Sequence, residues 1–136
     1  MNRLLLDTNA YVAFKRGDTG ALDIIRHAEH IAFSTVVLGE LLAGFALGTR
    51  EARNRTELAA FLQSPRVTVR PVDETTSGFY AHAYLALRRR GKPIPSNDLW
   101  VAATALQHGL ALFSYDEHFR HVDGLVVGCA LADFLP

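Results

Sequence analysis

Four carboxylates lie where strands are expected to end or helices to begin. Each is beside a short apolar segment or early in a helical pattern. They are Asp7, Glu40, Asp98 and Asp116. Carboxylates held close together repel one another, so they either take up protons or bind cations. Mg²⁺ prefers oxygen ligands, takes only a few carboxylates and leaves positions for waters and phosphate oxygens. If the four meet, they best suit metal-assisted cleavage of a phosphodiester, in which two-metal sites hold ions about 3.5 to 4 Å apart.

Strands alternating with helices are the elements that would have to bring these carboxylates together. Short apolar or β-branched runs predict strands over residues 4–6, 31–33, 67–69, 111–113 and 125–127. Periodic apolar patterns with breakers at their ends predict helices over residues 9–15, 21–29, 36–47, 50–63, 73–90 and 99–108. This alternation indicates an α/β fold, in which a mainly parallel central sheet carries helices on both faces. With 136 residues, the chain is expected to form one domain.

The carboxyl edge of such a sheet is where loops and helix N-termini converge and where ligands bind. Asp7 follows the first predicted strand, and Asp116 follows the fourth. Glu40 lies early in the helix after the second strand, on the flank of its apolar stripe, and Asp98 begins the helix that follows the breaker at residues 91–95. Each acid alone also has a structural interpretation, as a helix cap, a solvated helix residue or a turn residue. We favour the metal site because all four are expected at the same edge.

Four segments carry a resemblance to a known family. They are residues 5–9 (LLDTN), 40–44 (ELLAG), 95–103 (PSNDLWVAA) and 114–119 (SYDEHF). The chain resembles PIN-domain ribonucleases, and among them the VapC-type toxins of bacterial type II toxin-antitoxin systems. Any one segment is a weak signal, but the four in this order are specific, and they extend from the first predicted strand almost to the last. The resemblance implies a single PIN domain over residues 1–136.

The resemblance implies a Mg²⁺- or Mn²⁺-dependent endoribonuclease with the four acids as its catalytic and metal-binding quartet. Asp7 and Asp98 would bind metal directly, while Asp116 would hold a second ion or a water bound to metal. Glu40 could bind metal, carry a proton or act through water. Many members have Thr where this chain has Ser114, and both supply a hydroxyl. Side chains beside the acids are suited to orient them by hydrogen bonds, namely Thr8, Asn97 and Ser114.

The resemblance also implies partners beyond the RNA substrate. Toxins of this type form homodimers and bind a cognate antitoxin, whose tail covers the acidic site, often with an Arg. A guanidinium can take the place of a metal beside carboxylates. The apolar helices predicted over residues 36–47 and 50–63 are candidates for the dimer or antitoxin surface, although both could simply pack on the sheet.

The chain carries no net charge that would attract a polyanion such as RNA over a long distance, because its 14 basic and 14 acidic side chains balance to zero. Contacts to nucleic acid would need local patches such as Arg50, Arg53 and Arg55, or residues 88–92, which could equally be a solvated helix end. No apolar run reaches the length of a membrane span, and an acid comes too early for a signal peptide, so we expect a cytoplasmic protein without membrane contact. The single cysteine, Cys129, is expected to be buried and structural rather than reactive.

Several other side chains could bind a metal or a base, but we expect them to be structural. His27 with His30, and His118 with His121, have a spacing that suits zinc, but no cysteine or further motif accompanies them. His118 is also left outside the acidic quartet. Trp100 could stack on a base, but its apolar neighbours favour packing in the core. In the helix over residues 73–90, the expected buried side comprises Ala81, Tyr84, Leu85 and Leu87.

Two other classes of function stay open as alternatives. A PIN-like protein without catalysis would only bind a partner, and metal-dependent RNA cleavage separates it from the nuclease. A phosphoacceptor receiver domain would carry paired acids after its first strand and a lysine after its last. This chain has the single Asp7 there, and its lysines are Lys15 and Lys92. For the nuclease, we expect Asp7→Ala or Asp98→Ala to abolish cleavage with the fold intact, because removing a carboxylate relieves repulsion.

Overall fold

The structure, a computed structural model, describes residues 3–135. The strands are β1 (Arg3–Leu6), β2 (His30–Ser34), β3 (Val67–Arg70), β4 (Ala111–Phe113) and β5 (Val127–Gly128). The helices are α1 (Thr8–Lys15), α2 (Thr19–His27), α3 (Thr35–Leu47), α4 (Glu51–Leu62), α5 (Glu74–Arg89) and α6 (Ser96–His108). Two short 3₁₀ helices follow, η1 (Glu117–His121) and η2 (Leu131–Phe134). Within this described part of the chain, no helix is long and apolar enough to cross a membrane.

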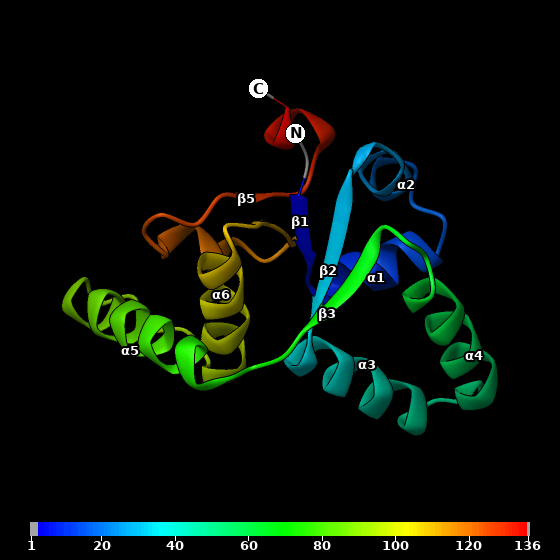
Figure 1. Cartoon of the computed structure of the whole chain (residues 1–136), viewed down its shortest axis with the longest axis horizontal. Helices are drawn as coiled ribbons and strands as arrows, with labels where there is room; N and C mark the ends of the chain where they lie inside the picture. The colour runs from blue at the N-terminus through cyan, green and yellow to red at the C-terminus, as the bar shows by residue number, and fades with distance from the viewer. Residues whose placement is uncertain (1–2, 136) are drawn as a thin grey trace.

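The five strands form one parallel sheet with the order β3-β2-β1-β4-β5. β1 lies at its centre, where Leu5 is opposite Ala32 of β2 and Leu112 of β4. Figure 1 shows α5 and α6 on one side of the sheet and α1 and α2 on the other. The predicted α/β architecture, a parallel sheet with helices on both faces, is therefore confirmed.

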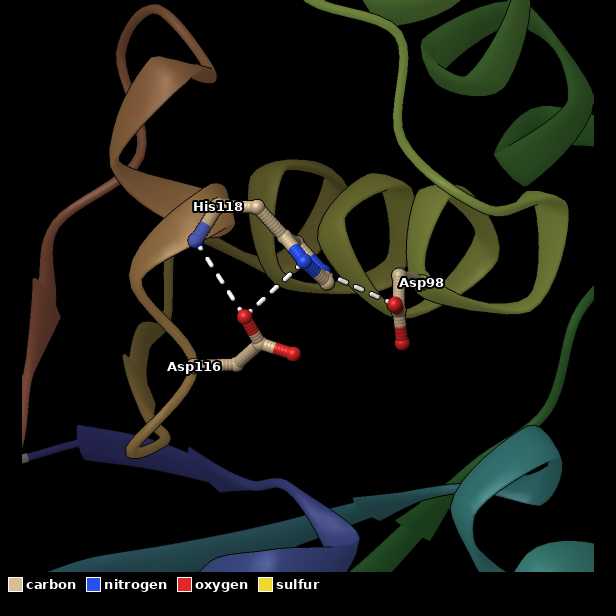
Figure 2. A group of neighbouring side chains, drawn as sticks. All are labelled: Asp98, Asp116 and His118. Atoms are coloured by element: carbon tan, nitrogen blue, oxygen red, sulfur yellow. Dashed lines mark hydrogen bonds and ion pairs between the residues drawn. The ribbon is translucent and has the colours of Figure 1, made fainter.

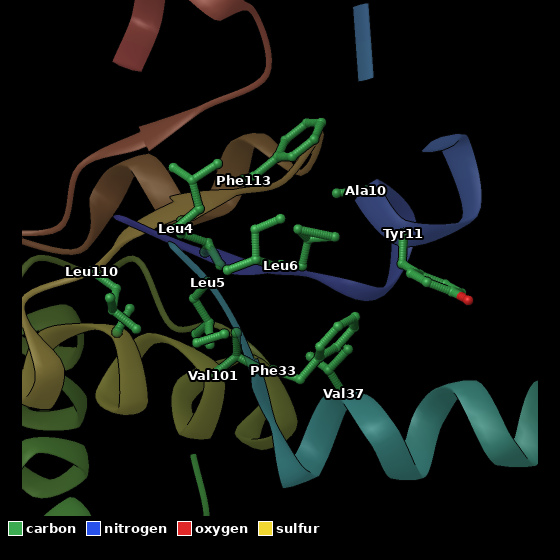
Figure 3. Packing of buried hydrophobic residues seen from close by; sticks show 14 of the residues in the cluster. Leu4, Leu5, Leu6, Ala10, Tyr11, Phe33, Val37, Val101, Leu110 and Phe113 are labelled. Atoms are coloured by element: carbon green, nitrogen blue, oxygen red, sulfur yellow. The ribbon is translucent and has the colours of Figure 1, made fainter. Parts of the chain in front are cut away.

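The core lies on both sides of β1, because a central strand that helices cover has no face left for water. Residues 4–6 are fully buried, and Phe33 and Phe113 from the neighbouring strands are buried beside them (Figure 3). Full burial of a leucine side chain stabilises a fold by about 1.5–3 kcal/mol. The strand ends at Asp7, so the packing of its leucines also fixes where this carboxylate lies.

The predicted elements agree with the structure to within two or three residues at their ends. The largest shift among the strands concerns the last one, which was expected over residues 125–127 and is found at Val127–Gly128. Gly128 pairs with Phe113 of β4, and a Cβ at this position would clash with Asp133 and Phe134 of η2. The close approach of η2 therefore explains why this strand position is a glycine.

The buried side of α5 differs from the prediction. Ala83 and Leu87 are buried, whereas Ala81 is exposed, as are Tyr84 and Leu85 with exposed fractions of 44% and 45%. The physical reason is that α5 packs against α6 and not against the sheet. The α5 residues 76, 80, 83 and 87 recur at helical spacing and make one buried or half-buried stripe. Three of the four residues expected inside lie outside this stripe and are exposed.

Trp100 and Cys129 are less buried than predicted. Trp100 of α6 is half-buried and stacks on Tyr80 of α5, with ring centroids 4.1 Å apart. It therefore stabilises the contact between these two helices rather than the centre of the core. Cys129 is a half-buried free thiol between β5 and η2.

Candidate metal-binding active site

The four predicted carboxylates meet in one cavity of about 450 Å³. Asp7, Glu40, Asp98 and Asp116 all line it, together with residues of α1 and Arg16 at the end of that helix. They come from the end of β1, from α3, from the first turn of α6 and from the segment after β4. The prediction that they share the carboxyl edge of the sheet is thus confirmed, and their roles in binding and catalysis stay a prediction.

Asp7 both caps α1 and lines this cavity, so its structural interpretation is confirmed and its role as a metal ligand stays a prediction. Its side chain accepts a hydrogen bond of 2.9 Å from the backbone N–H of Thr8 and one of 2.7 Å from the hydroxyl of Ser114. The residue is only 5% exposed. Burial raises the pKa of Asp7, and the donors Ser114 and Thr8 offset part of that rise. The neighbouring acids raise it further, which marks a carboxylate that a cation would stabilise.

Ser114 ties the end of β4 to the start of α1. Its hydroxyl donates to Asp7 and accepts from the backbone N–H of Asp116 at 3.1 Å. Asn9, which the sequence reasoning missed, accepts from the backbone N–H of Tyr115 at 3.1 Å. These bonds hold the segment that carries Asp116 against the segment that carries Asp7. The expectation that Ser114 orients a carboxylate fits this geometry.

Glu40 joins α1 to α6 through both of its oxygens. Oε1 accepts a hydrogen bond of 2.7 Å from the hydroxyl of Thr8, and Oε2 accepts one of 2.7 Å from Nδ2 of Asn97. Thr8 and Asn97 were expected to orient the acids in general. In the structure their side chains both hold Glu40, which lies on α3.

Asp98 lies in the first turn of α6 but does not cap that helix. Pro95 occupies the cap position, where no side chain makes a capping hydrogen bond, so the structural interpretation of Asp98 fails. The side chain is 16% exposed. Burial raises the pKa of Asp98, His118 opposes that rise, and the nearby charges of Glu40 and Asp116 add to it. Asp98 is therefore a poorly hydrated carboxylate among other carboxylates.

His118, on η1, bridges two of the four acids (Figure 2). Its Nε2 lies 2.8 Å from Oδ2 of Asp98, and its Nδ1 lies 2.8 Å from Oδ1 of Asp116. Its backbone N–H also donates to Oδ1 of Asp116 at 3.2 Å. Sequence reasoning left His118 outside the quartet, and the structure brings it into the site. The signal that could have found it is an imidazole two residues after a carboxylate at a strand end.

The donor set at this position fits a divalent cation. One oxygen each of Asp98 and Asp116 and one ring nitrogen of His118 all lie within 4.8 Å of one another. In the described residues 3–135 this is the one group of three or more such side chains close enough to share an ion. Buried carboxylates with raised pKa values gain most from a nearby cation, because the ion offsets both lost hydration and mutual repulsion.

A groove of about 500 Å³ between α1, α3 and α4 continues from the acidic cavity. The two share Thr8, Val12, Arg16 and Glu40. The groove has apolar side chains such as Tyr11, Leu41 and Phe45, and four basic ones, namely Lys15, Arg16, Arg50 and Arg53. Two of the three arginines in the first predicted basic patch therefore lie beside the site. In the second patch, Arg90 instead pairs with Asp123 at 2.8 Å.

Known proteins with similar sequences and structures show the family to which the chain belongs. The family model of the PIN domain matches residues 4–125. Ribonuclease VapC5 of Mycobacterium tuberculosis is 30% identical over 121 residues, which cover 88% of this chain and 87% of that protein. The DNA-bound VapBC structure from Salmonella typhimurium contains a chain with the same fold, with a TM-score of 0.82 and 21% identity over 94% of this chain and 98% of that one.

A chain in the structure of VapBC-5 from Mycobacterium tuberculosis, described as a member of the VapBC family of toxin-antitoxin systems, is 25% identical. It has a TM-score of 0.72 and covers 94% of this chain and 97% of its own length. The match of the family model over most of the chain also sets the receiver-domain alternative aside. The chain therefore belongs to the PIN domain family, in its VapC branch.

Proposed function

We propose that this protein is a divalent-metal-dependent endoribonuclease that acts as the toxin of a toxin-antitoxin pair, with Mg²⁺ or Mn²⁺ as its ion. The observation that carries the proposal is the meeting of Asp7, Glu40, Asp98 and Asp116 in one cavity at the carboxyl edge of the sheet. Membership of the PIN family and 30% identity to a protein named as a ribonuclease support it. RNA is then the substrate, and the cytoplasm is the compartment where the protein would meet it.

In this proposal the four acids have different roles in metal binding and catalysis. Asp7 and Asp98 hold the ion, because burial and neighbouring charge favour a cation beside them. Asp116, which lines the same cavity, holds a second ion or a water bound to metal. An ion in this position would lower the pKa of an attacking water and stabilise negative charge on the leaving oxygen. Each oxygen of Glu40 already accepts one hydrogen bond and has room for a further donor. We assign Glu40 to orient the attacking water and accept its proton.

The basic side of the groove supports RNA as the substrate. Lys15, Arg16, Arg50 and Arg53 line it, so phosphates on either side of the cleaved bond would find cations beside the acidic cavity. Lys15 and Arg53 each lie 3.6 Å from Glu57 in partly exposed pairs. Exposed pairs of this length are weak, so both side chains can exchange Glu57 for a phosphate at little cost.

The partners in this proposal are an antitoxin and a second copy of the chain. Solved relatives with this fold are VapBC toxin-antitoxin complexes, which supports an antitoxin partner. The groove with its apolar residues and basic side chains, formed by α1, α3 and α4, suits an antitoxin segment, and an antitoxin guanidinium could enter the acidic cavity in place of the ion. For the homodimer, the exposed face of α5 that holds Ala81, Tyr84 and Leu85 is the better candidate.

Cleavage of total RNA by the purified chain tests the proposed function. The assay compares Mg²⁺ or Mn²⁺ with EDTA, and an Asp98→Asn variant purified in the same way controls for contaminating nuclease. We expect metal-dependent cleavage that the variant loses by at least about a hundredfold, since a ligand and its charge are removed together. Cleavage at equal rates by both proteins would contradict the assignment. No cleavage by wild-type protein that is free of antitoxin would favour the alternative of a silent binding protein.

A further inference from the structure

We propose that His118 is itself a ligand of the divalent ion, through Nε2, and that this nitrogen gives the site a preference for Mn²⁺ over Mg²⁺. The inference rests on the proposed function, because it needs an ion at the acidic cavity. It goes further by adding a nitrogen donor to an acidic quartet of oxygen donors. The group that would share the ion consists of Asp98, Asp116 and His118.

The surroundings of Nε2 suit a ligand better than a hydrogen-bond donor. The atom is buried and, among the described residues 3–135, has no aligned hydrogen-bond partner. It nevertheless lies 2.8 Å from Oδ2 of Asp98. The two atoms are close enough for both side chains to reach one ion. A buried polar nitrogen without a partner is unfavourable, and a cation would remove that cost.

The other side of the ring lies against a carboxylate, an arrangement that is common for histidines that bind metal. A histidine that binds metal commonly donates its second ring N–H to a carboxylate, which fixes the tautomer and the ring orientation. Here Nδ1 lies 2.8 Å from Oδ1 of Asp116, and the same oxygen accepts the backbone N–H of His118 at 3.2 Å. The ring also packs on Phe119, with centroids 4.9 Å apart. Asp116 thus anchors His118 through one oxygen, and its other oxygen stays available to the ion.

A competing account makes His118 a protonated imidazole that pairs with both acids and leaves when an ion arrives. The two ring contacts of 2.8 Å, to Asp98 and to Asp116, are compatible with both accounts in the absence of an ion. The two accounts differ once an ion is present, because only a ligand keeps its nitrogen bonded to the metal. They also differ in selectivity. An imidazole ligand favours transition ions over Mg²⁺, whose preferred ligands are oxygens.

The experiment uses the full-length chain saturated with Mn²⁺, whose unpaired electrons report directly bound nitrogen by pulsed electron paramagnetic resonance. Wild-type protein is compared with His118→Gln and with His121→Gln, a matched change on the same short helix that removes the same number of imidazoles. Calorimetric titration with Mn²⁺ and with Mg²⁺ accompanies the spectra. We expect a ¹⁴N coupling in wild type and in His121→Gln that is absent in His118→Gln. The affinity of His118→Gln for Mn²⁺ should fall by roughly tenfold or more, and that for Mg²⁺ by less.

The outcomes separate this inference from the proposed function. Binding of Mn²⁺ by wild type without a ¹⁴N coupling would overturn the role of His118 and leave the acidic metal site standing. A coupling that persists in His118→Gln would overturn it as well, because another nitrogen would then be the ligand. Failure of wild type to bind Mn²⁺ at all would overturn the metal site of the proposed function. Absence of the ¹⁴N coupling in the wild-type spectrum overturns the inference even if His118→Gln does not fold.

Discussion

The hydroxyl of Ser114 donates a 2.7 Å hydrogen bond to Oδ2 of Asp7, across a sequence separation of 107 residues. The contact follows from the sheet, because Leu6 and Phe113 are opposite one another on the adjacent parallel strands β1 and β4. Asp7 and Ser114 are the residues directly after these two strands, and both are buried. Two neighbouring strand ends therefore fix one carboxylate of the candidate active site.

Replacing Ser114 tests whether this hydrogen bond prepares Asp7 for an ion. In Ser114→Ala, Asp7 keeps the backbone N–H of Thr8 as a donor but loses the hydroxyl that orients its second oxygen. We expect the affinity for Mn²⁺ to fall by about 10- to 100-fold, as for other groups that orient metal ligands. Ser114→Thr keeps a hydroxyl and is the control. Equal losses in the Ala and Thr variants, measured by calorimetric titration, would refute an orienting role.

Asp7 variants should separate the role of the charge from the role of the cap. The sequence alone suggested that Asp7→Ala would keep the fold intact, but the structure shows that Asp7 caps α1. Loss of such a cap costs about 0.5–2 kcal/mol, so we expect Asp7→Ala to melt below wild type in EDTA. Asp7→Asn keeps an acceptor and removes a buried charge whose pKa burial has raised, so it should melt at or above wild type at neutral pH.

Both variants should lose RNA cleavage, because each removes the carboxylate. Thermal denaturation in EDTA and the cleavage assay check the two statements separately. An Asp7→Asn protein that melts well below Asp7→Ala would show that the charge itself holds the metal-free fold together.

Asp73 should make stability depend on pH through the cap of α5. Its side chain accepts hydrogen bonds from the backbone N–H and hydroxyl of Thr76 and from Nε2 of Gln107 on α6. The backbone N–H of Thr76 is the main cause that lowers the pKa of Asp73 below its usual value of 3.8. The folded state thus favours the charged form. The resulting stabilisation is complete above 3.8 and is lost as the pH falls through the lower folded-state pKa.

We therefore expect Asp73→Ala to lower the melting temperature at neutral pH and to approach wild type in strong acid. Asp23→Ala, at an exposed aspartate of α2, controls for the change in net charge. Thermal melts over a pH series provide the measurement. A difference between Asp73→Ala and wild type that stays constant down to strong acid would assign the effect to packing rather than to the charged cap.

Strand ends explain why so much of the site could be predicted from sequence. Asp7 and Asp116 come shortly after apolar strands, and parallel strands bring their carboxyl ends to one edge whatever the details of packing. His118 could not be predicted in the same way. Its position between Asp98 and Asp116 depends on the turn of η1 and on where α6 begins in space, which no local pattern specifies.

The incorrect prediction of the buried face of α5 has a different cause. The helix carries apolar residues on more than one side, so periodicity alone does not decide which stripe is covered. Burial depends on the neighbour, and α5 packs against α6 through the stripe that contains Ala83 and Leu87. Ala81, Tyr84 and Leu85 lie outside that stripe and are exposed. Their apolar character is therefore better explained by a partner than by the core of this chain.

If that partner is a second copy of the chain, a charge on this face should separate the dimer. We expect wild type to be a dimer by light scattering after size exclusion, and Leu85→Glu to be a monomer that still unfolds cooperatively, since Leu85 is 45% exposed. Leu47→Glu is the matched control, because Leu47 is 91% exposed at the end of α3. A dimer that survives Leu85→Glu but dissociates in Leu47→Glu would move the interface to α3 and α4, the helices that the sequence first suggested. A monomeric wild type would refute the homodimer itself.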